Sequence, residues 1–127
     1  MTQDPEHSTS SLAAVSNAMI ALHKDQFGRG PSYARSYFAG PDALICVLED
    51  VLLPAEQKLV RMGEHQRVRE TRMAYQVAAA DDFVAAVERI VSRKVRAFAS
   101  ATDVAKNVVF ENFVFERGSS DGQPRTL

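Results

Sequence analysis

The 127-residue chain is predicted to fold as one α+β domain, an antiparallel four-stranded sheet with helices packed on one face. Two observations predict this class. Apolar residues recur at helical spacing before residue 28 and, over a longer run, after residue 64. Two pairs of β-prone runs, each pair separated by a few turn-forming residues, follow these helical patterns. The resulting order is α-β-β-α-α-β-β, which most simply gives one sheet covered by its helices.

The first helix is indicated by four apolar residues at helical spacing. Ser10 and Ser11 precede this pattern and can accept hydrogen bonds from the first free backbone amides as N-caps. The helix should stop at Gly28, because glycine takes the left-handed conformation without steric cost, and Pro31 cannot continue the helical ladder. The four apolar residues are Leu12, Val15, Met19 and Leu22.

Residues 32–38 and 43–52 are predicted to form the first hairpin. The group 39–42, Ala-Gly-Pro-Asp, supplies the turn between them. The second of these strands is apolar at nearly every position from 43 to 48, which indicates a central place in the sheet. A second hairpin is predicted from the alternating residues 95–102 and the strand 108–115.

Two helices should connect the hairpins, a short one from Pro54 to about residue 61 and a long one over 65–93. Asp81 and Asp82 are adjacent poor helix formers, so we keep one helix but leave open a kink or break there. The long helix has a broad apolar face that suits packing on the sheet and also contact with a second subunit. The candidate homodimer residues on this face are Met73, Val77, Val84, Val87 and Val91.

Composition places the chain among ordinary globular proteins, with 46% hydrophobic and 24% charged residues. A formal charge of −1 removes the broad electrostatic attraction on which most nucleic-acid and anionic-membrane binders rely. Residues 1–8 and 118–127 are polar or rich in Gly, Ser and Pro, so we expect disordered tails around a single domain at 9–117. The chain has no basic leader followed by an apolar run and no stretch of about 20 apolar residues, which predicts a cytoplasmic location.

The sequence does not point to catalysis or to a metal site, and we expect no cofactor. The three histidines are scattered, and His23 is interpreted as a histidine that either complements the helix dipole or is partly exposed. Cys46 lies in an apolar strand and is interpreted as a small buried hydrophobe in a reducing compartment. The carboxylate pairs Glu49-Asp50 and Asp81-Asp82 should point in different directions, so neither forms a shared acid and base.

The turn Gly28-Arg29-Gly30-Pro31, together with Arg35, is the best candidate for a ligand site. Glycine-exposed amides and the two guanidinium groups could hold a phosphate or a carboxylate. However, the turn ends a helix rather than opening one, so the helix dipole there repels anions. The competing interpretation is a helix stop that leads into the first strand.

A set of basic residues around the two central helices raises the alternative of RNA binding. Acidic residues are interspersed among them, which is typical of a solvated face, and exposed aromatic residues for base stacking are missing. Nucleic-acid binding is therefore only the third interpretation. The basic residues are Lys58, Arg61, Arg67, Arg69 and Arg72.

Several of these residues carry a resemblance to a known family. Ser16-Asn17-Ala18, then Gly28-Arg29-Gly30-Pro31 with Arg35, then 51–56, Val-Leu-Leu-Pro-Ala-Glu, resemble the MpsC-like bacterial family over about residues 10–116. The resemblance implies a component of a sodium-translocating system that generates membrane potential, acting beside membrane subunits; it implies no known active site. The chain departs from the family pattern at three positions: Asp50, where glycine is usual; Leu53, where a capping threonine is usual; and Ser92, near the usual glycine that closes the long helix.

The sequence thus predicts a non-enzymatic cytoplasmic subunit that forms a homodimer and acts through protein contacts. It is expected to be accessory to a cation-translocating membrane system and to reach the membrane through a partner. The alternatives that stay open are a small-ligand or anion sensor that uses Gly28 to Pro31 with Arg35, and an RNA-binding module.

Overall fold

The computed structural model describes residues 5–117 and confirms the predicted order of elements. The sheet is antiparallel throughout, with strand order β1-β2-β4-β3, so the two hairpins meet through β2 and β4. The predicted tails fall largely outside the described residues, although α1 includes residues 5–8. The elements are α1 (Pro5–Phe27), β1 (Tyr33–Phe38), β2 (Ala43–Glu49), α2 (Pro54–Arg61), α3 (His65–Val91), β3 (Val95–Asp103) and β4 (Val108–Phe115).

Helix α1 begins at Pro5, so Ser10 and Ser11 lie inside it and not at its N-cap. Proline is favoured in the first turn of a helix, where its missing N–H has no intrahelical partner to lose. Pro5 therefore suits the first described turn of α1. Residues at i, i+4 spacing, Val15, Met19, His23 and Phe27, form the buried side of the helix.

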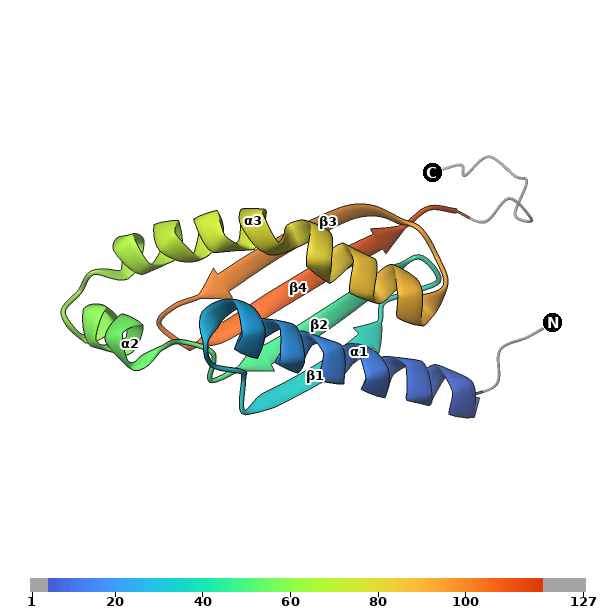
Figure 1. The fold of residues 1–127 in the computed structure, drawn as a ribbon, viewed down its shortest axis with the longest axis horizontal. Helices are drawn as coiled ribbons and strands as arrows, with labels where there is room; N and C mark the ends of the chain where they lie inside the picture. Colours follow the sequence, from blue (N-terminus) through green and yellow to red (C-terminus); the bar gives the residue numbers. More distant parts are fainter. Residues whose placement is uncertain (1–4, 118–127) are drawn as a thin grey trace.

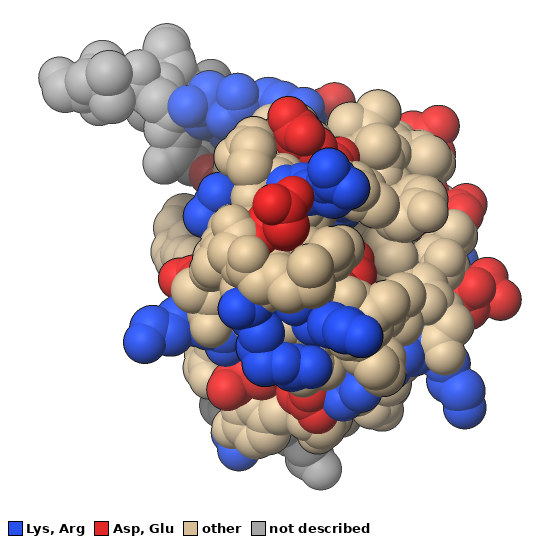
Figure 2. Space-filling model, turned by 90° about the vertical axis from the view of Figure 1, so that its left-hand side faces the viewer, with Lys and Arg blue, Asp and Glu red and all other residues tan. Residues whose placement is uncertain are grey.

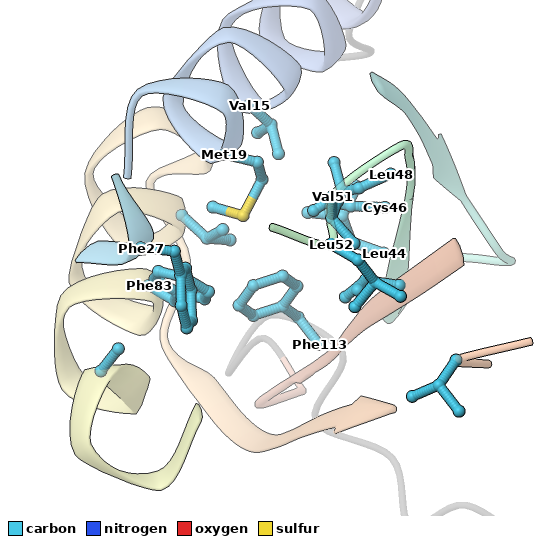
Figure 3. Close-up of a cluster of buried hydrophobic side chains, with 14 of the residues drawn as sticks. Val15, Met19, Phe27, Leu44, Cys46, Leu48, Val51, Leu52, Phe83 and Phe113 are labelled. Atoms are coloured by element: carbon cyan, nitrogen blue, oxygen red, sulfur yellow. The ribbon is translucent and has the colours of Figure 1, made fainter. Parts of the chain in front are cut away.

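All three helices lie on one face of the sheet (Figure 1). Helix α1 packs over β1, and α3 packs over β3 and beside α1. The hydrophobic core fills the space between this helix layer and the sheet, where side chains from both layers converge (Figure 3). Its completely buried members include Met19 from α1, Phe83 from α3, and Leu44 and Phe113 from the sheet.

Helix α3 is continuous across Asp81 and Asp82, so the alternative of a break there is wrong. Both carboxylates are exposed, where water solvates them, and Asp82 accepts a 2.9 Å hydrogen bond from Gln26 Nε2 of α1. The helix ends at Ser92, which adopts a left-handed conformation (φ 62°) and donates its N–H to the Glu88 carbonyl.

Strand β2 ends at Glu49, three residues before the predicted end, because the backbone turns at Asp50. Asp50 has a φ of 61° and donates its N–H to the backbone carbonyl of Asn107. The side-chain oxygen of Asn107 then accepts hydrogen bonds from the N–H groups of Val51 and Leu52, at 2.8 and 2.9 Å. These two residues leave the sheet but stay buried, so the connection to α2 is part of the core.

Candidate functional site

The turn at Gly28–Pro31 is held by contacts within the fold. Gly28 has a φ of 79° and donates its N–H to the Lys24 carbonyl at 2.9 Å, which is the expected glycine end of α1. Gly30 lies against the same helix, because a Cβ there would come within 3.1 Å of the Ile20 carbonyl oxygen. Pro31 is buried. The glycines therefore serve a helix end and a close approach of two backbone segments.

The two arginines of the predicted ligand site are used separately. The Arg29 guanidinium forms a 2.7 Å ion pair with Asp50. Arg35 is exposed on β1 and lies over the ring of Tyr33, with 5.2 Å between its guanidinium carbon and the ring centroid. The groove that Arg35 lines, between α1 and β1, contains no residue of the turn. The geometry thus gives the anion site less support than the helix-stop interpretation.

The five predicted dimer residues do not form one surface. Met73 and Val77 are 62% and 73% exposed, whereas Val87 is completely buried in the core of its own domain. Val84 and Val91 are half-buried and pack against that core. The last two turns of α3 cover the sheet, and the exposed large apolar side chains of the helix, Met73, Tyr75 and Val77, all lie in its first half.

The most unusual feature of the core is a buried pair of titratable groups, His23 of α1 and Glu111 of β4. His23 Nε2 lies 2.9 Å from a Glu111 carboxylate oxygen, and the two side chains are 1% and 0% exposed. Our interpretation of His23 as a partly exposed group is therefore wrong. A signal was present in the sequence: His23 continues the i, i+4 stripe of Val15 and Met19, and Glu111 alternates in phase with Val109 and Phe113.

Cys46 extends this polar cluster across the sheet. The Ser36 hydroxyl donates to its sulfur at 3.4 Å and lies 2.8 Å from the Ser16 hydroxyl. Burial raises the pKa of the Cys46 thiol to about 11, the Ser36 hydrogen bond lowers it, and the nearby Glu111 carboxylate raises it. The thiol therefore stays protonated at neutral pH and is a poor nucleophile, as the sequence interpretation expected.

Arg72 of α3 is buried, not part of a solvated basic face as its sequence setting indicated. Its Nε and one terminal nitrogen donate to the two carboxylate oxygens of Glu56, at 2.9 and 2.5 Å, and the same nitrogen reaches the Val51 carbonyl at 3.0 Å. Glu56 also accepts the Leu53 N–H at 2.8 Å, which is the half of a capping box that does not depend on the side chain at position 53. This pair joins the start of α2 to α3.

The other basic residues of that region lie at the end of the molecule formed by α2 and the start of α3. Lys58, Arg61, Arg67 and Arg69 are exposed there. Figure 2 faces this end and shows acidic side chains among the basic ones. Arg67, for example, pairs with Glu64 at 3.2 Å. The mixed signs match the prediction of a solvated face.

An apolar groove runs between α3 and β3, and we call it the α3–β3 groove. Its volume is about 200 Å³. Ser100 lines it, and the buried hydroxyl oxygen of Ser100 has no hydrogen-bond partner among the described residues. Buried polar atoms are normally paired, so this hydroxyl is an unsatisfied polar group in the wall of the groove. The lining residues are Met73, Gln76, Val77, Ala80, Phe98 and Ser100.

Among residues 5–117, no helix lies over the opposite face of the sheet (Figure 1). We call it the open sheet face; it consists of the odd-numbered residues 33–37 of β1, 43–49 of β2 and 97–103 of β3, and the even-numbered residues 108–114 of β4. The strand registers place Tyr37, Ile45, Asn112 and Ala99 in one row across it. Tyr37 is 49% exposed and Phe110 of the next row 37% exposed. These exposed aromatics were missed from the sequence, because strand alternation alone does not say which face the helices cover.

The geometry defines a small α+β domain that has two apolar surfaces, the α3–β3 groove and the open sheet face. Within residues 5–117, no group of three or more His, Cys, Asp or Glu side chains is placed to hold a metal ion. Across the same residues, none of the helices has the length and hydropathy needed to cross a membrane.

Residues 8–117 match the model of the family described as Na+-translocating membrane potential-generating system (MpsC), and the chain belongs to that family. This confirms the resemblance seen in the sequence. No curated protein and no solved structure matches the chain.

The structure also explains two of the departures from the family pattern. Asp50 and Ser92 both have left-handed backbones, with φ of 61° and 62°. Glycine adopts this conformation most readily, which is the physical reason for a family glycine at or near such positions. Asp50 uses its side chain there to pair with Arg29.

Proposed function

We propose that this chain is a non-enzymatic subunit that acts through protein contacts and is accessory to a cation-translocating membrane system. It works in the cytoplasm and reaches the membrane through its partner. Family membership supports the link to sodium translocation, since the family description names such a system. The observation that carries the proposal is the α3–β3 groove.

The groove has the properties of a site for a partner segment. Val77 and Met73 at its rim are more than half exposed, which is costly for an apolar pair unless a partner covers it. The groove also adjoins β3, which is an edge strand because it pairs only with β4. Edge strands and apolar grooves beside them recur as binding sites for extended peptides, with backbone hydrogen bonds supplying affinity and pockets supplying specificity.

The reactive groups of the chain support a role other than catalysis. The His23–Glu111 pair is enclosed between α1 and the sheet, and the Cys46 thiol is buried with a raised pKa. Catalytic groups need access to substrate and a pKa matched to their task. These groups instead stabilise the interior of the domain.

The test is co-purification with the membrane subunits of the sodium-translocating system of the source organism. The chain is co-expressed with those subunits, the complex is extracted in detergent, and the membrane subunits are captured through a tag. We expect the chain to be retained, and Val77→Asp to reduce retention by at least about tenfold, because an acidic group in a covered apolar site costs at least the roughly 1.4 kcal/mol of one decade.

Ala85→Asp is the matched control, because Ala85 is exposed on the same helix but does not line the groove. Retention of this variant should equal that of the unmodified chain. Sodium-dependent membrane potential in cells should fall with Val77→Asp and not with Ala85→Asp. If the unmodified chain is not retained by the membrane subunits, the proposed function is wrong. Equal retention of both variants would instead remove the groove as the contact.

A further inference from the structure

We propose that the open sheet face is a homodimer interface, in which two copies of this chain pack face to face with their strands antiparallel across the interface. This inference goes beyond the proposed function and is independent of it, because it uses the surface opposite the α3–β3 groove. It also moves the expected dimer contact from α3 to the sheet.

The composition of the face is unsuited to water. An antiparallel sheet covered on one side normally places polar residues on the other. Here the central strands β2 and β4 present Ile45, Val47, Phe110 and Val114, all partly or largely accessible, with Tyr37 beside them on β1. Two such faces can bury these side chains against each other in the manner of a sandwich, whose sheets pack about 10 Å apart.

The charges at the two ends of the face favour a second copy as the occupant. Glu49 and Asp103 are exposed at one end, in the row that also contains Tyr33 and Val108. Arg96 is exposed at the other end of β3, at the irregularity between Val95 and Ala97. The first end thus carries two acids, with Arg35 one row further in, and the opposite end carries Arg96, so the ends of two copies can complement each other.

These charges also select the orientation of the two copies. A two-fold axis parallel to the strands would lay the acidic end of one copy over the acidic end of the other. A two-fold axis that lies in the plane of the face, perpendicular to the strands and at its centre, places the two ends of one copy over the opposite ends of the other. Asp103 of each copy then approaches Arg96 of the other. The β3 strands then cross through Ala99 and Ala101, whose small side chains permit close approach.

The size of the face sets the expected affinity. Four strands at about 4.8 Å spacing make the face roughly 20 Å wide. About seven residues per strand at a rise of about 3.3 Å make it roughly 23 Å long. Each copy therefore contributes less than the roughly 800 Å² that a standard stable interface buries per partner. The dimer should accordingly be concentration-dependent, forming over the micromolar range.

A nucleic acid is the competing occupant, since sheet-borne aromatics can stack on bases. The charges argue against it. Arg35 and Arg96 are offset by Glu49 and Asp103, so the face lacks the positive excess that phosphates require.

The test is sedimentation velocity or light scattering on the full chain from low to high micromolar concentration. We expect a reversible monomer–dimer equilibrium. Phe110→Asp should raise the dissociation constant by at least about tenfold, since two like charges would meet near the two-fold axis. Val77→Asp is the matched control, and it should leave the equilibrium unchanged because Val77 lies on α3, away from the open sheet face. Circular dichroism and urea unfolding of each variant establish that the monomer is folded.

A charge reversal tests the orientation. Arg96→Asp and Asp103→Arg should each weaken the dimer, and the double variant should recover most of the lost affinity. A chain that is monomeric at every concentration would overturn the proposal, as would a dimer that Val77→Asp disrupts and Phe110→Asp leaves intact. Salt-sensitive retention of single-stranded RNA by a monomeric chain, abolished by Phe110→Asp, would assign the face to nucleic acid instead. The two proposals can fail independently. The dimer is expected whether or not the chain co-purifies with the membrane subunits.

Discussion

On β4, Phe110 and Glu111 are neighbours in sequence but lie on opposite faces of the sheet. An apolar residue is expected on the helix-covered face and a polar residue on the open face, and these two residues show the reverse. Glu111 points into the helix-covered core and is completely buried, while Phe110 is 37% exposed on the open side. The same reversal recurs on β1, where Ser36 is buried and Tyr37 is exposed. The difference teaches that the open face has a composition unlike that of an ordinary solvent-exposed sheet face.

The two faces are also stabilised differently. The covered face is closed by α1 and α3, and some of its polar groups have partners on α1, such as His23 for Glu111 and Ser16 for Ser36. On the open face, the described part of the chain contributes side chains of the sheet and no helix. Substitutions on the covered face should therefore change the stability of the monomer, and substitutions on the open face should change association.

The largest contrast should come from the two phenylalanines of β4. Phe113→Ala should lower the free energy of unfolding by about 3–5 kcal/mol, because it leaves a cavity in the closed core. Phe110→Ala should change it by no more than about 1 kcal/mol at concentrations where the chain is monomeric. Urea unfolding at low protein concentration measures both. Equal losses would mean that the open face contributes to the core of the monomer.

The titration of Cys46 gives the next largest effect. Burial raises the pKa of this thiol to about 11, against about 8.5–9 in an unfolded chain. Between these values the unfolded state has lost the proton and the folded state keeps it, so stability falls as pH rises from about 9 to 11. The unmodified chain should lose about 2–3 kcal/mol more than Cys46→Ala across this window, measured by urea unfolding at each pH.

A thiol moved to the neighbouring position provides the control for that comparison. In the Cys46→Ala background, Ile45→Cys places the thiol on the open face. It should react with iodoacetamide at pH 8 in the folded protein, whereas Cys46 should react only after unfolding. Rapid labelling of native Cys46 would contradict its burial behind α1.

The buried carboxylate should show a smaller difference. Glu111→Ala removes the partner of His23, so the free energy of unfolding should fall by about 1–3 kcal/mol, the cost of a buried polar group left unsatisfied. Asn112→Ala, one residue further and on the open face, should stay within about 0.5 kcal/mol in the monomer. If the two variants lose the same stability, the His23–Glu111 contact contributes nothing.

The smallest expected effect lies at the end of the helix layer that covers the sheet. Ser92→Gly should raise the free energy of unfolding by about 1 kcal/mol, because it relieves the left-handed backbone at the end of α3. Ser92→Ala is the control and should give no gain, since alanine has the same steric cost there. Thermal unfolding would show an increase of a few degrees for the glycine variant alone.

Much of the fold could be predicted because its boundaries depend on residues that act locally. Pro54 starts α2, Gly28 ends α1 and Gly63 separates α2 from α3, all where the sequence placed them. Helix α1 extends N-terminal of the predicted caps Ser10 and Ser11, because residues 5–9 fit either a tail or a helix. Of the candidate site, the Gly28–Pro31 turn was located correctly as a helix stop, but the surfaces that face solvent were not.

The sequence by itself determined the order of helices and strands, the phase of each alternating strand, the buried state of Cys46 and the family. These follow from backbone preferences and periodicities that act over a few residues. Only the tertiary structure decided that His23 meets Glu111, 88 residues away, that Arg72 is buried against Glu56, and that Tyr37 and Phe110 share an uncovered face. Alternation sorts the residues of a strand into two sets, but which set is covered depends on where helices distant in the sequence pack.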